Sequence, residues 1–320
     1  MKQPNFWFIP NSWKSFLLRP FGFIYGKIVA LRLKINKPYR SKIPVICVGN
    51  ICVGGTGKTP ICLALADYFS QRGKKVFFLN HGYKSKLQNV LINLEQHSPK
   101  DLSDEAMIFA HKLPTIIDHN RARGAQKAEQ MGADIIIMDD GFQNPGLYKQ
   151  LSFVVFDGVY GAGNGLCMPA GPLRESLKQG LKRADAVVIV GEDKTGLENQ
   201  IKKLYPQLLV LHGHVEPTQD LNGIKGIAFA GIGHPDKFFD MLEKKGAVLT
   251  EKIAFSDHCT YSRKDVEDLI ARGQPLLTTL KDAVKIDADL RSELIVVDIE
   301  FMFDNPVEWD SLITGKLNNE

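Results

Sequence analysis

The fold of this chain is decided by one glycine-rich stretch, Gly49-Asn50-Ile51-Cys52-Val53-Gly54-Gly55-Thr56-Gly57-Lys58-Thr59-Pro60. It follows a short apolar run, Ile43 to Val48, and precedes an apolar-periodic segment, Ile61 to Phe69. Strand, glycine-rich loop and helix in this order are the context in which a phosphate-binding loop is credible. The sequence therefore predicts a nucleotide phosphate loop, against the alternative of a glycine-rich turn without a ligand.

Phosphate binding requires each part of this order. Glycines allow consecutive backbone N–H groups to turn toward a phosphate, and the N-terminus of the next helix adds the positive end of its dipole. Lys58 can reach the outer phosphates, and the Thr59 hydroxyl can bind Mg²⁺. One position departs from the usual pattern, since Cys52 stands where a glycine is expected. The predicted binding residues are Gly54, Gly55, Thr56, Gly57, Lys58 and Thr59.

Length and composition indicate a soluble globular protein of one large or two medium domains. The chain has 320 residues, of which 44% are apolar and 24% charged, and this composition can fill a sizeable core. Its five cysteines are scattered and form no CxxC pair, so neither a disulfide framework nor a zinc site is indicated. A reducing cytoplasm fits this cysteine usage.

The net charge of +4 conceals a basic N-terminus. Residues 1–66 contain ten Lys or Arg and no Asp or Glu. These cations lie among aromatic and aliphatic residues, which favours an anionic lipid surface over nucleic acid as the partner. No uncharged apolar run reaches 18 residues, so we expect short interfacial helices, separated at Pro10 and Pro20, rather than a spanning helix. The alternative is an arm packed on the protein's own core.

Short apolar runs alternate with helical stretches along the rest of the chain, which is typical of an α/β protein with a covered parallel sheet. A polar, turn-rich seam near residues 216–223 precedes a new strand–helix series. We therefore expect a P-loop NTPase-like core with a mostly parallel sheet, a smaller C-terminal α/β lobe and an amphipathic arm that faces the membrane. The predicted bounds are 1–41 for the arm, 42–216 for the core and 224–320 for the smaller lobe.

Two further stretches carry acids in informative places. Asp139 and Asp140 follow a strand of four apolar residues, and acids at such a strand end help to hold Mg²⁺ in P-loop proteins. Asp104 and Glu105 follow Ser103 just before a helical segment. Asp104 is a candidate general base, but Ser103 as a helix cap with acids in the first turn explains the same pattern.

Three other stretches are weaker signals. In 255–261, His258 could carry or orient a proton, while a surface histidine is the simpler interpretation. Arg174 stands in a Gly/Pro turn at a helix start, where it could bind an anion or merely begin a helix. Lys281 and Lys285 are helical neighbours, for which a solvated face is the default expectation.

In this order, the stretches together resemble the tetraacyldisaccharide 4'-kinase family of the lipid A pathway of Gram-negative bacteria. The resemblance covers nearly the whole chain and rests on Gly49-Asn50 with the loop to Pro60, His81-Gly82-Tyr83, Ser103-Asp104-Glu105, Asp139-Asp140-Gly141-Phe142-Gln143, Pro169-Ala170-Gly171-Pro172-Leu173-Arg174-Glu175, Ala230-Gly231-Ile232-Gly233, Phe255-Ser256-Asp257-His258 and Lys281-Asp282-Ala283-Val284-Lys285. The family also lacks the early glycine of the loop, which accounts for Cys52. The chain departs from the family's usual residues at His81, Cys259 and Leu280, among other positions.

The resemblance implies an activity and roles for residues. The family transfers the γ-phosphoryl group of ATP to the 4'-hydroxyl of a tetraacylated glucosamine disaccharide 1-phosphate, giving lipid IVA. It implies Asp104 as the base with His258 as its partner, Lys58 as a catalytic phosphate ligand, and Thr59, Asp139 and Asp140 as the Mg²⁺ site. The positions that it implies to line the site are Glu105, Arg121, Gln143, Arg174, Glu175 and Asp257.

The expected partners are therefore the acylated disaccharide and the anionic surface of the inner membrane, with no nucleic acid. The expected location is the cytoplasmic face of that membrane, to which the enzyme binds peripherally or monotopically. Two other functions fit the same motifs: a membrane-associated P-loop ATPase, and a kinase of another acceptor. A GTPase switch is disfavoured, because no Asn-Lys-x-Asp motif that reads guanine is present.

Overall fold

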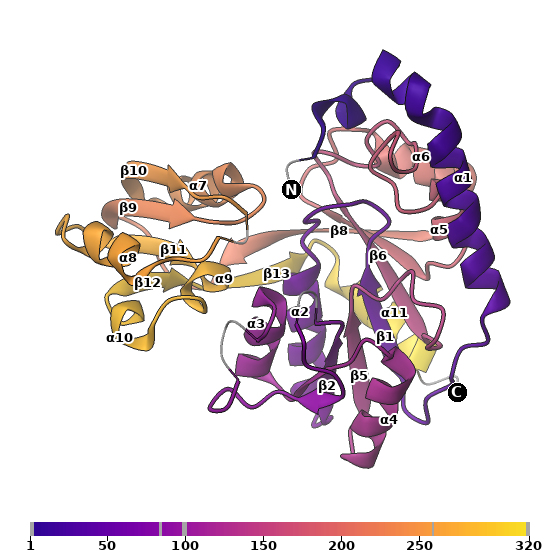
Figure 1. Ribbon diagram of the computed structural model, residues 1–320, viewed down its shortest axis with the longest axis horizontal. Helices are drawn as coiled ribbons and strands as arrows, with labels where there is room; N and C mark the ends of the chain where they lie inside the picture. Colours follow the sequence, from indigo (N-terminus) through magenta and orange to yellow (C-terminus); the bar gives the residue numbers. More distant parts are fainter. Residues whose placement is uncertain (1–2, 83–84, 98–100, 258, 318–320) are drawn as a thin grey trace.

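The computed structural model describes residues 3–82, 85–97, 101–257 and 259–317. Within them the chain forms two separate sheets, one of nine strands and one of four. Figure 1 shows the larger unit with the N-terminal helix along its outer side and the smaller sheet on the opposite side. The predicted α/β class is confirmed.

The nine-stranded sheet has the order β13-β8-β7-β6-β1-β5-β2-β4-β3. Its centre is β1 (Val45–Gly49), which pairs in parallel with β5 (Ile135–Asp139) and β6 (Leu151–Asp157). All residues of these three strands are buried, which explains their continuous apolar runs. The remaining strands are β2 (Val76–Asn80), β3 (Val90–Leu91), β4 (Thr115–Ile117), β7 (Ala186–Val190), β8 (Leu209–Pro217) and β13 (Ile299–Phe303). Among the described residues of this sheet, the outermost pairs, β3 with β4 and β13 with β8, are antiparallel and the others are parallel.

Helices cover both faces of this sheet. One face packs against apolar residues of α4 (Arg121–Gln130), α5 (Leu177–Leu181) and α6 (Leu197–Leu204). The other face packs against α2 (Lys58–Ser70), α3 (Asp104–Lys112) and α11 (Pro306–Leu317). Because its strands are parallel and covered on both faces, the sheet brings their carboxyl ends to one edge, which is where α/β proteins bind ligands.

The four-stranded sheet has the order β10-β9-β11-β12, and all its pairs are parallel. Its strands are β9 (Lys225–Ala230), β10 (Val248–Ala254), β11 (Leu276–Thr279) and β12 (Leu294–Val297). Helix α7 (Pro235–Lys244) packs on one face. Helices α8 (Arg263–Ile270) and α10 (Ala288–Arg291) pack on the other, and the short α9 (Leu280–Ala283) follows β11.

The end of the chain returns to the larger sheet. β13 pairs antiparallel with β8, and α11 packs against the face that α2 covers. Residues 299–317, which the sequence assigned to the smaller lobe, therefore lie with the core. An edge strand that pairs with a distant segment has no local signal that reveals its partner. The domain bounds 42–216 and 224–320 otherwise stay a prediction.

The N-terminal segment consists of a 3-10 turn, η1 (Asn5–Phe8), and the long helix α1 (Trp13–Ile35). Pro20 lies inside α1, so the expectation that it separates two short helices is wrong. The helix packs through small residues: a Cβ on Gly22 would lie 2.5 Å from the carbonyl oxygen of Cys167. This close packing holds the helix against the larger unit. Pro20 has no N–H, so α1 lacks one backbone hydrogen bond at this exposed position. Among the described residues, no helix is long and apolar enough to cross a bilayer.

Candidate active site

The predicted phosphate loop connects β1 to the N-terminus of α2. Gly57 precedes α2 with φ of 84°, and Gly54 has φ of 106°, values that glycine adopts without strain. Asn50 holds the loop closed, because its side-chain amide donates to the Gly54 carbonyl at 3.3 Å and to the Thr56 hydroxyl at 3.1 Å. Backbone amides at the start of a helix of thirteen residues thus face the carboxyl edge of the sheet.

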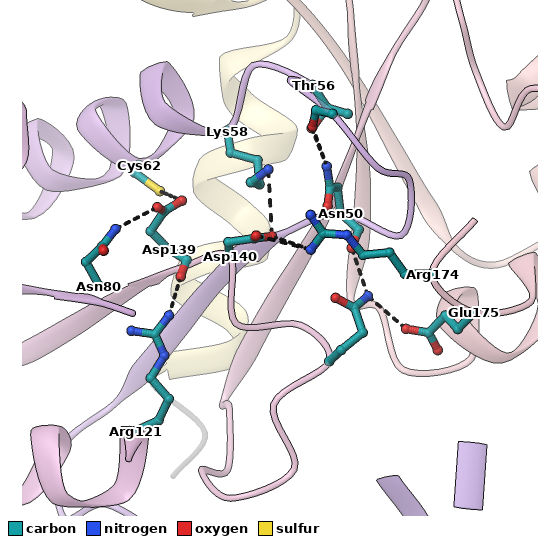
Figure 2. Close-up of polar contacts among 12 residues, drawn as sticks. Asn50, Thr56, Lys58, Cys62, Asn80, Arg121, Asp139, Asp140, Arg174 and Glu175 are labelled. Carbon is teal, nitrogen blue, oxygen red and sulfur yellow. Dashed lines mark hydrogen bonds and ion pairs between the residues drawn. The ribbon is translucent and has the colours of Figure 1, made fainter. Parts of the chain in front are cut away.

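Asp139 ends β5 beside this loop and Asp140 directly follows the strand, and the two acids have different surroundings (Figure 2). Asp139 is buried and accepts a hydrogen bond from the Asn80 amide at 3.0 Å. Burial raises its pKa to about 7, although Lys58 opposes the shift. Burial would also raise the pKa of Asp140, but Lys58 and Arg174 outweigh it and hold this pKa below its usual value. At neutral pH one acid is therefore firmly ionised, and the other is close to its titration point.

The raised pKa of Asp139 predicts a stability effect. A pKa higher in the folded than in the unfolded chain stabilises the fold at low pH, and this contribution is lost as the pH rises from about 4 to about 7. Asp139→Asn cannot ionise, so without Mg²⁺ and nucleotide it should melt roughly 2–6 °C above the wild type at pH 8. The difference should shrink toward pH 4.5. Thermal melts in a chelator at both pH values check this, and a variant that melts lower at pH 8 would contradict it.

Arg174 and Lys58 converge on Asp140. The Arg174 guanidinium donates to both carboxylate oxygens at 3.0 and 3.1 Å, and the Lys58 ammonium lies 3.7 Å from one of them. Asp140 has φ of 47°, and Figure 2 shows its carboxylate between the Lys58 ammonium and the Arg174 guanidinium. Two cations and one ionised carboxylate therefore meet at the mouth of the phosphate loop, an arrangement suited to a charged ligand.

Gln143 and Glu175 hold the start of the phosphate loop through hydrogen bonds. The Gln143 amide donates to the Asn50 carbonyl at 2.8 Å and to the Glu175 carboxylate at 2.9 Å. Glu175 is fully buried and forms an ion pair with Arg183, whose guanidinium stacks on Phe142 at 4.3 Å. Leaving a buried carboxylate unpaired would destabilise the fold, so Glu175 keeps Gln143 and Arg183 in place. These two predicted residues therefore hold the first turn of the loop in place.

Arg121 lies beneath the acids. Its guanidinium donates to the carbonyls of Leu79 at 3.1 Å and Asp139 at 2.9 Å, so it ties the ends of β2 and β5 together. Burial lowers its pKa to about 10, which leaves it cationic at neutral pH. Its positive charge thus acts on the two acids from inside the protein.

Asp104 and Glu105 form the first turn of α3, where Ser103 caps the helix by accepting from the Ala106 N–H at 3.3 Å. The capping interpretation of this stretch is confirmed. The same two acids face lysines of the smaller lobe: Glu105 lies 3.0 Å from Lys281, and Asp104 lies 3.7 Å from Lys285. The expectation that these lysines form a solvated face is wrong, since the Lys285 side chain is only 6% exposed.

The proposed partner of the base, His258, lies outside the described residues. Its neighbour Asp257 is exposed and is close enough to Lys281 to help raise that lysine's pKa. Burial alone would lower the pKa of Lys281, but Glu105 outweighs it. Asp257 therefore lies near the contact that Lys281 of the smaller lobe makes with Glu105 of α3.

Sequence reasoning missed several residues of the site: Gln3, Asn80, Arg183 and Cys62, whose thiol donates to the Asp139 carboxylate at 3.9 Å. Asn80 ends an apolar strand, as Asp139 does, and this strand-end position was the available signal. Gln3 is less accessible to prediction: its amide donates to the Val53 carbonyl at 2.7 Å from fifty residues away. Such contacts depend on the path of the whole N-terminal segment.

The residues at this edge fit a magnesium–nucleotide complex. Mg²⁺ prefers oxygen ligands and is usually bound through one or two carboxylates together with substrate phosphates. Asp139, Asp140 and the Thr59 hydroxyl supply such oxygens. In the described part of the chain no group of three or more His, Cys, Asp or Glu could hold a metal by itself. These residues therefore suit a Mg²⁺ ion whose remaining ligands are phosphate oxygens of a bound nucleotide.

A covered parallel sheet, a phosphate loop that opens α2 and two acids at the neighbouring strand end define a P-loop nucleotide-binding enzyme. The family model for Tetraacyldisaccharide-1-P 4'-kinase matches residues 14–318. The chain belongs to this tetraacyldisaccharide 4'-kinase family.

Individual relatives agree with the family match. The tetraacyldisaccharide 4'-kinase of Paramagnetospirillum magneticum is 45% identical over 312 residues, which cover 96% of each chain. That of Rhodospirillum rubrum is 40% identical, with 98% of this chain and 97% of the relative covered. A crystal structure of the Aquifex aeolicus family member in complex with ATP superimposes with a TM-score of 0.75 at 26% identity, covering 95% of this chain and 99% of the other.

Proposed function

We propose that this chain transfers the γ-phosphoryl group of ATP to the 4'-hydroxyl of tetraacyldisaccharide 1-phosphate, giving lipid IVA in lipid A biosynthesis. Family membership supports the reaction. The observation that carries it is the meeting of Lys58, Asp140 and Arg174 at the mouth of the phosphate loop. Phosphoryl transfer needs positioning and charge neutralisation above all, and this cluster offers both.

The phosphate loop and its lysine bind the nucleotide in this proposal. Backbone amides of residues 54–59 hold the phosphates, and the Lys58 ammonium neutralises charge on the β- and γ-phosphates. Thr59, Asp139 and Asp140 would hold Mg²⁺, which withdraws charge from the phosphate oxygens when bound. Arg174, which donates to Asp140, adds a second positive charge on the γ-phosphate side of the loop.

Asp104 is the general base of the proposed reaction. It accepts the proton of the 4'-hydroxyl as the sugar oxygen forms a bond to the γ-phosphorus and the bond to the ADP oxygen breaks. In this proposal His258, the family's partner of the base, keeps the role of tuning the basicity of Asp104 through a charge pair. Glu105 and Asp257 line the acceptor side, while Gln143, Glu175 and Arg121 fix the loop and the strand ends.

The chain should therefore consume ATP only when an acceptor is present. The test is ADP release in Mg²⁺ and detergent micelles, measured with and without tetraacyldisaccharide 1-phosphate. Rapid ADP release with the lipid and little without it supports the proposal. Equal ADP release in both mixtures would indicate an ATPase.

The N-terminal helix is proposed to bind the anionic inner-membrane surface from the cytoplasmic side. Opposite its packed face, α1 exposes a stripe of large apolar side chains: Trp13, Phe16, Leu17, Phe21, Ile24, Ile28, Leu31 and Ile35, each more than half exposed. Lys14, Arg19, Lys27, Arg32 and Lys34 flank the stripe. An exposed apolar stripe with neighbouring cations matches an interfacial helix. This placement would bring acyl chains of the substrate alongside the site.

Polar substitutions on this stripe are expected to release the protein from membranes. In the triple variant Leu17→Ser, Ile24→Ser, Ile28→Ser, three side chains that are 55–65% exposed no longer favour the acyl region. Binding to vesicles with anionic lipids should fall by about tenfold or more in co-sedimentation. The matched control is Val248→Ser, Met302→Ser, Val307→Ser, at apolar residues exposed elsewhere by 43–71%. Equal loss in both variants, or none in either, would refute membrane docking through α1.

A further inference from the structure

Two lysines of the smaller lobe lie against the first turn of α3. Lys281 is 3.0 Å from Glu105 and 4.0 Å from Asp104, and Lys285 is 3.7 Å from Asp104. Apolar residues accompany the charges, because Leu280 and Val284 pack in one cluster with residues of α3 such as Ala106. The stretch 279–285 therefore joins the smaller lobe to the proposed base.

The smaller lobe holds Lys285 rigidly. Asp282 is fully buried, and one of its carboxylate oxygens accepts from the Gly231 N–H at 3.0 Å and the Thr279 hydroxyl at 2.7 Å. Its other oxygen accepts from the Lys285 ammonium at 2.8 Å. The same ammonium lies 5.3 Å from the centre of the Tyr261 ring. These contacts leave the lysine few alternative positions.

The geometry suggests more than a structural ion pair. Burying a lysine is costly, and Asp282 already supplies one close, hydrogen-bonded counter-ion. Lys285 nevertheless extends to the interface with α3 and places its charge beside a second carboxylate on another unit of the fold. A nearby cation favours the ionised form of a carboxylate and restricts its rotamers. Asp104 would need both properties to accept a proton.

We propose that Lys285 is a positioning residue for Asp104, supplied by the smaller lobe and held by Asp282, which keeps the base ionised and aimed at the acceptor hydroxyl. The proposal rests on the function proposed above. It assigns the stretch from Thr279 to Lys285 a part in catalysis, whereas Lys281 fixes Glu105 beside it.

The experiment compares Lys285→Met with the wild type in lipid phosphorylation assays. The methionine keeps the length of the side chain and removes its charge. We expect kcat to fall about 10- to 100-fold, less than on loss of the base itself, with little change in the KM for ATP. Lys285→Arg should restore most of the lost kcat. The matched control, Lys252→Met, breaks a surface pair with Glu243 in the same lobe and should leave kcat unchanged.

A double-mutant comparison separates positioning from general support of the fold. In an Asp104→Asn background, Lys285→Met should lower kcat little further, because the carboxylate that Lys285 positions is already gone. If Lys285→Met lowered kcat by the same factor in both backgrounds, the proposal would be overturned. A wild-type kcat in Lys285→Met would overturn it as well. If the methionine variant does not fold, Lys285→Gln, which can still donate to Asp282, is measured by the same criteria. A wild type that phosphorylates no lipid would instead refute the proposed function.

Discussion

Replacing Lys58 by methionine is expected to lower kcat/KM for ATP by about 10³-fold or more. The ammonium lies at the start of α2, 3.7 Å from Asp140, where the outer phosphates of a nucleotide bind. Removing one preorganised electrostatic partner of a transition state typically costs about 10²–10³ in rate, and this residue also contributes to nucleotide binding. The measurement is steady-state kinetics together with the Kd of a fluorescent ATP analogue.

The control for Lys58 stands beyond the other end of the same helix. Lys74 is exposed just after α2, and Lys74→Met changes the same residue type in the same way. It should retain wild-type kcat and ATP affinity. If Lys58→Met kept more than half of the wild-type kcat/KM, the loop could not be the catalytic phosphate site.

Replacing Asp104 by asparagine should lower kcat by about 10²–10⁴, the usual contribution of a positioned general base. The asparagine keeps the shape of the side chain but cannot accept the hydroxyl proton. ATP affinity should stay near that of the wild type, because the phosphate loop lies on a different element from α3. Single-turnover lipid phosphorylation and ATP binding, measured on the same preparation, separate the two effects.

Asp67→Asn is a suitable control for this variant. Asp67 is exposed on α2, so its neutralisation should alter neither kcat nor ATP affinity. An Asp104→Asn enzyme with a normal kcat would remove Asp104 from the role of base. A variant that also lost ATP affinity would point to a structural effect through the cap of α3.

The core of the fold could be predicted because its signals are local. Each buried parallel strand of the core is an apolar run, and the loop after β1 carries its own glycines. The seam after β8 was visible as a polar, turn-rich segment. Periodicity and turn chemistry were sufficient for these elements, because neighbouring residues determine them.

Other parts of the fold depend on contacts between distant segments. The return of β13 to β8 pairs residues more than eighty positions apart, as in Ile299 with Pro217. Helix α1 continues past Pro20 because its glycines pack against Cys167. Tertiary contacts outweigh local preference in both cases, so no window of sequence could reveal them.

The candidate site divides in the same way. Lys58, Asp139 and Asp140 follow from strand-end and loop positions, and the structure brings Lys58 and Asp140 to 3.7 Å. Arg121 could be named only through a family resemblance, and the structure finds it tying strand ends rather than exposed to a ligand. Lys285 was wrongly expected to be solvated, because its contact with Asp104 joins two distant parts of the chain. Lys285 and its buried partner Asp282 belong to the smaller lobe, whereas Asp104 begins α3 beside the larger sheet.

The most direct test of the proposed reaction is to find where the phosphoryl group of ATP goes. The wild-type chain is incubated with γ-labelled ATP, Mg²⁺ and tetraacyldisaccharide 1-phosphate in micelles, and the lipid product is analysed by phosphorus NMR and mass spectrometry. We expect one labelled lipid with a new phosphate monoester at the 4'-position beside the original 1-phosphate. Label in inorganic phosphate alone, or on any other position or acceptor, would contradict it.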